Sequence, residues 1–202
     1  ACIEPITALP TDPAGGIPVT TGEDGFVAVE NLPVPVWLYG TSYRTFYVCA
    51  NGYVTFTGGD TDYTESLADH FRMPRVSALF NDFSPQVAGT LSWKPTVDRI
   101  AVTWQNVPEY NTSNRNTFQV ELFYDGQIHI SWLGVDATTG IVGLSEGNGL
   151  PGDFVESDLS ATRACGPDCP GDFNGDATVG LADLSVLLAH YGMTSGAQYE
   201  DG

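Results

Sequence analysis

Residues 117–132 have the sequence TFQVELFYDGQIHISW, the most regular stretch of the chain. Apolar and polar side chains alternate around Asp125-Gly126, a dipeptide that forms tight hairpin turns because glycine accepts a positive φ. A period of two places one face of a strand in the core and the other in water. The stretch therefore predicts an antiparallel hairpin with a polar outer face.

Shorter segments of the same kind lie on both sides of this hairpin. Regularly spaced short strands separated by turn residues are typical of β-sandwiches and jelly rolls. We therefore predict a mainly β protein with an antiparallel β-sandwich or jelly-roll-like domain. The further predicted strands are residues 26–29, 45–49, 53–56, 75–80, 90–93, 99–104 and 141–144.

Composition divides the chain into four parts. Residues 1–25 are rich in proline, threonine and glycine, which is typical of an extended arm. Such an arm is either a free tail or a strand that pairs with the sheet edge of a neighbouring molecule. We predict this arm over 1–25, a β-sandwich domain over 26–163, a linker with two cysteines over 164–171, and a separate C-terminal segment over 172–202.

The charge of the chain is strongly acidic, with 25 acidic and 7 basic residues and a net charge of −18. This surface repels phosphate groups, so the sequence predicts neither a nucleic-acid partner nor an anionic membrane partner. It suits divalent cations and keeps the chain soluble. No apolar stretch reaches the roughly 18 residues that a spanning helix needs, so we expect no membrane insertion.

The four cysteines, Cys2, Cys49, Cys165 and Cys169, allow three disulfide pairings. The close pair is separated by three residues and has no histidine nearby, which does not fit a zinc site. We therefore predict two disulfides and an oxidising compartment, and prefer Cys165–Cys169 and Cys2–Cys49. The opening Ala-Cys fits a mature end left by signal-peptide cleavage, so we expect a secreted or cell-surface protein.

Residues 172–183, with the sequence DFNGDATVGLAD, have oxygen-bearing side chains at loop positions 1, 3, 5 and 12. An EF-hand-type loop binds calcium with this spacing, because calcium takes six to eight oxygen ligands at about 2.3–2.6 Å. Leucines at 181, 184, 187 and 188 then form the apolar stripe of a helix that Gly192 ends. The predicted ligands are the side chains of Asp172, Asn174, Asp176 and Asp183 and the backbone carbonyl of Thr178.

The segment from Asp172 to Tyr191 resembles one repeat of a dockerin, a calcium-binding module that docks into cohesins. Like dockerins, it has aspartate at loop position 12, whereas Ala177 replaces the usual loop glycine and no second repeat follows before Gly202. The resemblance implies one calcium ion and an apolar stripe without its usual partner helix. The stripe packs on its own β-domain, packs head-to-tail on another copy, or belongs to a fragment.

Four short motifs lie along the β-domain, at residues 51–56 (NGYVTF), 78–83 (ALFNDF), 116–120 (NTFQV) and 142–145 (VGLS). Through these motifs, residues 26–160 resemble bacterial relatives of the nidogen-like domain. Such domains are extracellular adhesion modules, so the resemblance implies binding rather than catalysis.

No catalytic centre is evident. The chain has three histidines and no Gly-x-Ser-x-Gly nucleophile turn, and spacing does not single out a carboxylate pair such as Asp82 and Glu121. We therefore predict a non-enzymatic protein for extracellular adhesion or assembly that binds a protein partner or, in a self-assembled filament, other copies of itself. A glycosidase or protease accessory with its own activity is a competing interpretation.

A carbohydrate-binding module attached to a scaffold through the dockerin-like repeat is the main alternative. Exposed aromatic rings on a sandwich face bind polysaccharide by stacking, although strand alternation places most of these rings in the core. Asn111 starts a formal glycosylation sequon in a loop. The aromatic candidates are Trp37, Tyr39, Tyr43, Trp93, Trp104, Tyr110, Tyr124 and Trp132.

Overall fold

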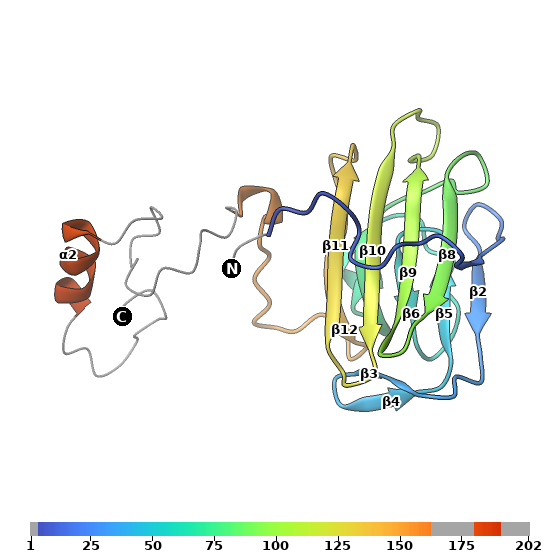
Figure 1. The fold of residues 1–202 in the computed structure, drawn as a ribbon, viewed down its shortest axis with the longest axis horizontal. Coiled ribbons are helices and arrows are strands. Elements are labelled where there is room, and N and C mark those ends of the chain that lie inside the picture. Colours follow the sequence, from blue (N-terminus) through green and yellow to red (C-terminus); the bar gives the residue numbers. More distant parts are fainter. Residues whose placement is uncertain (1–3, 163–179, 191–202) are drawn as a thin grey trace. The chain divides into compact units, whose positions relative to one another are not determined.

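The computed structural model describes residues 4–162 and 180–190 (Figure 1). The chain forms two units, one of which is Ile6–Val155 and the other Ala1–Pro5 with Glu156–Gly202. The first unit is the β-domain and contains every strand that the structure describes.

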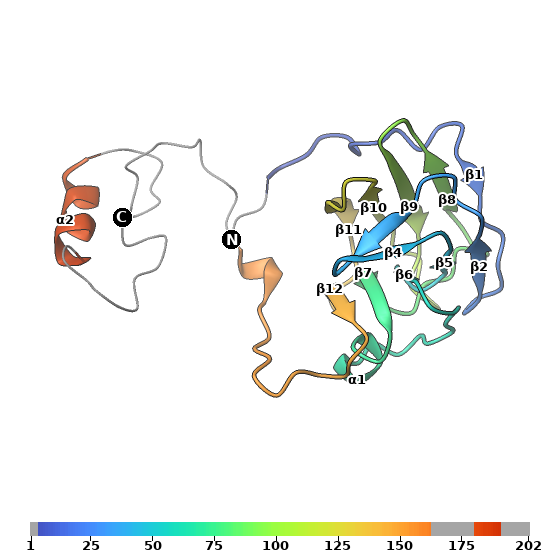
Figure 2. The same ribbon diagram turned by 90° about the horizontal axis from the view of Figure 1, so that it is seen from below.

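Two antiparallel five-stranded sheets form this domain, which confirms the predicted fold class (Figures 1 and 2). The first sheet has the order β1 (Ile17–Pro18), β8 (Thr90–Pro95), β9 (Arg99–Val107), β10 (Asn116–Phe123) and β11 (Ile128–Val135). The second has the order β12 (Ile141–Glu146), β7 (Pro74–Phe80), β6 (Tyr53–Thr55), β5 (Phe46–Cys49) and β2 (Phe26–Val29).

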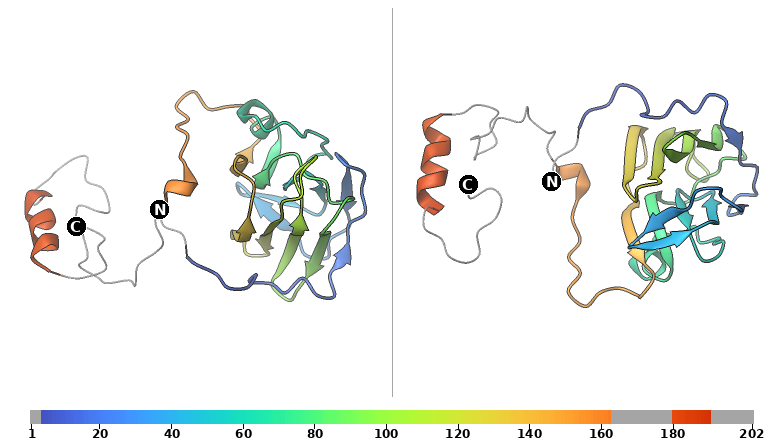
Figure 3. Two further views of the ribbon diagram at one scale, coloured as in Figure 1. Left: turned by 90° about the horizontal axis from the view of Figure 1, so that it is seen from above. Right: turned by 60° about the horizontal axis from the view of Figure 1, so that its bottom comes forward.

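A small hairpin of β3 (Val36–Leu38) and β4 (Thr41–Tyr43) crosses one end of the sandwich, as the right-hand view of Figure 3 shows. The short helix α1 (Leu67–His70) lies in the connection between β6 and β7. Its N-cap is Ser66, whose hydroxyl accepts a hydrogen bond from the Asp69 backbone N–H.

The hairpin of residues 117–132 is confirmed as β10 paired with β11. Phe118 pairs with Trp132, Val120 with Ile130 and Leu122 with Ile128. The three β10 side chains are at most 1% exposed and belong to the core between the sheets. Trp104 crosses this core, where its ring stacks on Phe118 at 5.1 Å and its Nε1 donates to Ala50 O at 3.0 Å.

The outer face of β10 is not in water, which differs from the prediction. Gln119 and Glu121 are 0% and 1% exposed because the N-terminal arm runs across this face (Figure 1), where Thr11 hydrogen-bonds to both side chains. Gln119 Oε1 accepts from Thr11 N at 3.0 Å, and Gln119 Nε2 donates to Thr11 O at 2.8 Å. The described part of the arm is thus not a free tail, because β1 pairs with β8 at the edge of its own sheet.

A buried ion pair lies on the outer face of the second sheet. Arg75 is fully buried and donates to Asp60, which also accepts from Arg72 at 3.0 Å. The Arg75 guanidinium lies 4.2 Å from the ring centroid of Tyr53 and 5.0 Å from that of Phe80. Asp60 belongs to the connection between β6 and β7, and Arg75 belongs to the sheet. Moving the connection away would leave the buried Arg75 charge uncompensated, so the ion pair holds the connection against the sheet.

Cys49 is a free, buried thiol, which corrects the preferred Cys2–Cys49 pairing. Strand alternation turns its side chain away from the main core into a second apolar cluster with Tyr53 and Phe80. Burial raises the pKa of the thiol to about 12, so it stays protonated. Cys2, Cys165 and Cys169 lie outside the described residues.

The C-terminal unit contains a 3-10 turn, Leu159–Ala161, and helix α2, Leu181–His190. The helix confirms the one predicted after the acidic loop. Among the described residues, no helix is long and apolar enough to cross a membrane.

Candidate ligand groove at one end of the sandwich

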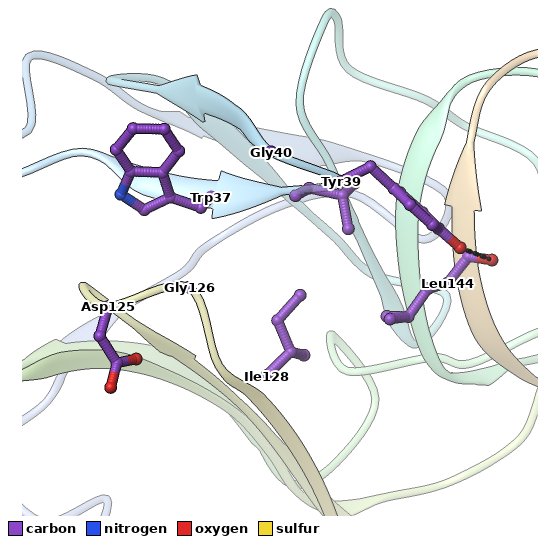
Figure 4. A pocket seen from close by; sticks show the side chains of 8 residues that line it. Trp37, Tyr39, Gly40, Asp125, Gly126, Ile128 and Leu144 are labelled. Atoms are coloured by element: carbon purple, nitrogen blue, oxygen red, sulfur yellow. Dashed lines mark hydrogen bonds between the residues drawn. The ribbon is translucent and has the colours of Figure 1, made fainter.

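A groove of about 410 Å³ lies where three segments of the β-domain meet (Figure 4). The segments are the β3–β4 hairpin, the turn between β10 and β11, and strand β12. Figure 4 shows Trp37 and Asp125 toward one end, Tyr39 and Leu144 toward the other, and Ile128 between them. The full lining is Trp37, Leu38, Tyr39, Gly40, Asp125, Gly126, Ile128 and Leu144.

Trp37 is placed in the groove by the alternation of β3. Its neighbours Val36 and Leu38 are 0% and 3% exposed and fill the core, so Trp37 points outward and keeps 37% exposure. Gly126 faces it across the groove, where the turn requires glycine for its φ of 98° rather than for space, because a Cβ there would lie at an ordinary contact distance of 3.7 Å from Trp37 Cβ. The indole is therefore anchored by its strand while its ring remains open to a ligand.

Tyr39 occupies a strained position in the β3–β4 turn. Its φ is 48° and that of Gly40 is 77°, the pattern of a two-residue turn in which both central residues are left-handed. Asparagine or glycine normally fills the first position, and a bulky side chain there costs roughly 1–2 kcal/mol. The Tyr39 hydroxyl donates to Leu144 O at 3.3 Å, while the side chain stays 56% exposed.

Asp125 is oriented by its own turn. Phe123 N donates to Gln127 O at 3.0 Å, and Gly126 has a φ of 98°, as expected for a three-residue hairpin loop. The Asp125 Oδ1 accepts from Gln127 N at 3.0 Å, and Oδ2 accepts from Gln127 Nε2 at 3.1 Å. The carboxylate is thus fixed but keeps lone pairs for a ligand, since a carboxylate has about four acceptor sites.

The groove therefore combines exposed aromatic rings, an apolar floor and one fixed carboxylate. Among its lining residues only Asp125 carries a charge at neutral pH. General acid–base work on a glycosidic bond needs a pair of carboxyl groups, whereas ligand binding needs only shape and a few oriented polar groups. The arrangement suits binding.

The eight aromatic candidates divide into five that lie in or against the core and three that are exposed. Trp104 is fully buried, whereas Trp37, Tyr39 and Tyr110 are exposed. The structure brings Trp37 and Tyr39 together in one groove and leaves Tyr110 in the β9–β10 loop. The remaining four, Tyr43, Trp93, Tyr124 and Trp132, pack partly buried against the core.

Asp125 lines the groove, although sequence reasoning did not single it out as a candidate site residue. The sequence identifies it as a turn residue, and no local signal places it beside Trp37. Only the topology does so, because the β3–β4 hairpin packs next to the end of β10.

His70 is buried and its Nδ1 lies 2.9 Å from Ser77 Oγ. Burial, aided by the positive charge of Arg75, lowers the pKa of His70 to about 4. The imidazole is therefore neutral at physiological pH and has a structural role beneath the β12 strand.

Asp82 and Glu121, the carboxylates that sequence spacing did not single out as a catalytic pair, have different surroundings. Glu121 lies under the arm, where its Oε1 accepts from Arg99 Nη1 at 3.0 Å. Asp82 lies among other acids, and its pKa is raised to about 6 by burial and by their charges. The acids that raise it are Asp24, Glu23, Glu65 and Glu109.

Of the predicted calcium ligands, the structure describes Asp183 alone. Its side chain is 2% exposed, and its Oδ2 accepts from Gly180 N at 2.7 Å at the start of α2. No group of three or more His, Cys, Asp or Glu side chains among residues 4–162 and 180–190 could hold a metal. Asp172, Asn174, Asp176 and Thr178 lie outside those residues.

Asn111, the predicted glycosylation position, is exposed in the loop between β9 and β10 and has a φ of 56°. Thr112 and Ser113 beside it are exposed as well. The sequon is thus accessible, and its glycosylation stays a prediction.

Comparison with known proteins gives one match. A family model described as NIDO related matches residues 7–164, which include the arm as well as the sandwich. No curated protein and no solved structure matches the chain.

Proposed function

Because the chain belongs to the NIDO-related family, we propose that it is a non-catalytic extracellular adhesion domain that contacts its ligand through the Trp37–Asp125 groove. The family supports an extracellular, adhesion-type domain. The groove supplies the contact surface, since it is a concave site with exposed aromatic rings and one oriented polar group.

The strained Tyr39 is the observation that carries this proposal. An aromatic residue at a φ of 48° costs stability that asparagine or glycine would not, and strain of this kind is concentrated at functional sites. Burial does not explain it, because more than half of the side chain is exposed. Its contribution is to form one wall of the groove.

A retention experiment tests the proposal. Beads coupled to the full chain are passed over surfaces that carry polysaccharides, extracellular-matrix proteins or the chain itself, and the fraction of beads retained on each surface is measured. We expect retention on at least one surface, and a loss of about tenfold in Trp37→Ala, because hot-spot aromatic contacts exceed about 1.4 kcal/mol. Tyr110→Ala is the matched control, since Tyr110 is also exposed but lies outside the groove.

Equal retention of the wild type, Trp37→Ala and Tyr110→Ala on every surface would contradict the proposal. Thermal unfolding of each variant separates this result from a folding defect. Trp37 points out of the core, so its removal should change the melting temperature little.

We propose in addition that residues 172–183 bind one calcium ion as a dockerin-like repeat. Asp172, Asn174, Asp176, the Thr178 carbonyl and Asp183 would supply the oxygen ligands. Support comes from α2, which begins at loop position 10 with Leu181, and from the buried position of Asp183 in its first turn. Calcium would fix the start of the helix relative to the loop.

Calorimetric titration of the full chain tests this site. We expect one calcium ion per chain, a tenfold or larger loss of affinity in Asp172→Ala and Asp176→Ala, and no loss in Asp153→Ala, an exposed acid outside the repeat. At a tenfold excess over Kd, calcium should stabilise the repeat by roughly 1.4 kcal/mol. Unchanged titrations in the loop variants would refute the site.

Self-assembly is a second candidate function, favoured by the apolar face of α2. Leu181, Leu184 and Leu188 are 82%, 47% and 62% exposed. If copies meet head-to-tail through this face, the light-scattering mass should grow with protein concentration in millimolar calcium and fall in EGTA. A monomer under both conditions would rule this candidate out.

A further inference from the structure

Resting on the proposed function of the groove, we infer that its ligand is a neutral glycan. A pyranose ring stacks on Trp37, and ring hydroxyls donate hydrogen bonds to the Asp125 carboxylate. The ligand class follows from the aromatic surface, the acceptor, the size of the groove and its charge.

The aromatic surface matches one face of a sugar. A pyranose ring presents C–H groups on its faces and hydroxyls around its rim, so a face packs on an aromatic π-system while the rim needs polar partners. Trp37 offers such a ring on a rigid strand, with Val36 and Leu38 buried on either side. Little side-chain freedom is lost when a ligand binds there.

The acceptor matches the rim of the same sugar. Both Asp125 oxygens are already held by Gln127, so the carboxylate is oriented before a ligand arrives. Hydroxyl groups are donors, and hydrogen bonds to a charged acceptor are about twice as strong as neutral ones. Ile128 and Leu144 leave the centre of the groove apolar, where further C–H groups pack.

Size favours a short saccharide stretch. The volume of about 410 Å³ lies near the lower end of the range for small-molecule sites, roughly 300–1,000 Å³. A site of this size accommodates one or two sugar rings, while the rest of a polysaccharide continues into solvent.

Charge excludes acidic glycans. The net charge of −18 is screened over about 8 Å at physiological salt, but Asp125 lies within the groove and would face a uronate or sulfate directly. A neutral sugar suffers no such repulsion, and its binding does not depend on ionic strength.

The test starts with the full chain on an array of neutral, acidic and amino-sugar glycans, followed by calorimetry with the best neutral oligosaccharide. We expect selective binding of neutral glycans, with the same Kd from about 50 mM to about 500 mM salt. Trp37→Ala should weaken binding about tenfold or more, Trp37→Phe less, and Tyr110→Ala not at all. Asp125→Asn should weaken it about threefold to tenfold, because Asn-Gly still forms the turn.

Two results would overturn the inference. One is the absence of neutral-glycan binding, or neutral-glycan binding that Trp37→Ala leaves intact. The other is a preference for acidic or amino-sugar glycans, or an affinity that falls steeply with salt. If retention on a protein surface still depends on Trp37, the groove remains the contact site and only the ligand class is wrong. If no retention depends on Trp37, the proposed function fails with it.

Discussion

At the scale of single residues, Tyr39 links stability to binding. A left-handed backbone costs asparagine less free energy than alanine. The free energy of unfolding of Tyr39→Asn should therefore exceed that of Tyr39→Ala by about 1 kcal/mol. Both variants lose the aromatic wall and should bind less well than the wild type. Urea unfolding measures the difference, and equal stability of the two variants would show that the turn is not strained.

His70 gives the fold a defined response to acid. Its pKa is lowered to about 4 in the folded state from about 6.5 in the unfolded state, so the unfolded chain binds the proton first as the pH falls. Neutral His70 therefore contributes up to about 3 kcal/mol to the free energy of unfolding above about pH 6.5, and this contribution is lost as the pH falls to about 4.

Denaturant unfolding between pH 7 and pH 4 checks this response. The wild type should lose stability more steeply than His70→Gln, which keeps a hydrogen-bonding side chain near Ser77 but does not titrate. Parallel curves for the two proteins would mean that His70 is solvated rather than buried.

At the scale of elements, the arm and β10 depend on each other. Gln119 is fully buried because its amide pairs with both backbone groups of Thr11. Gln119→Ala leaves those groups without partners and should cost about 1–3 kcal/mol in urea unfolding. Gln86→Ala, an exposed glutamine in a loop, should cost less than about 0.5 kcal/mol. A neutral Gln119→Ala would show that the arm is only loosely attached.

Local pattern explains which elements the sequence predicts. The hairpin of residues 117–132 follows from period-two alternation around one glycine turn, and α2 from its apolar stripe. The burial of Gln119 does not follow, because the partner lies 108 residues away and the arm has no periodic signal. In the groove, Trp37 is one of eight aromatic candidates, but its exposure follows from strand β3, which the pattern did not predict, and its nearness to Asp125 from the packing of β3 beside β10.

The preferred Cys2–Cys49 pairing failed for a related reason. Counting cysteines predicts pairs, but the pairing depends on which face of a strand each one occupies. Cys49 follows Val48 at the end of β5, so the alternation that sends Val48 into the main core sends Cys49 to the outer face. There it packs with Tyr53 and Phe80 as a small apolar side chain.

At the scale of the whole molecule, net charge and the groove act together. A charge of −18 opposes contact with other acidic surfaces, so we expect contact to come from a local site that charge does not oppose. The groove is such a site, because stacking and apolar burial are insensitive to salt. Retention of the full chain on the surface it recognises should therefore persist at about 500 mM salt, which a wash series measures.

Hydroxyl-radical footprinting of the full chain, with and without the soluble form of the surface that retains it, tests the central claim most directly. The account predicts that oxidation of Trp37 falls severalfold on binding, while Tyr110, exposed outside the groove, is labelled equally in both samples. Unchanged labelling of Trp37 in a saturated complex would show that the ligand binds elsewhere and that the groove is not the contact surface.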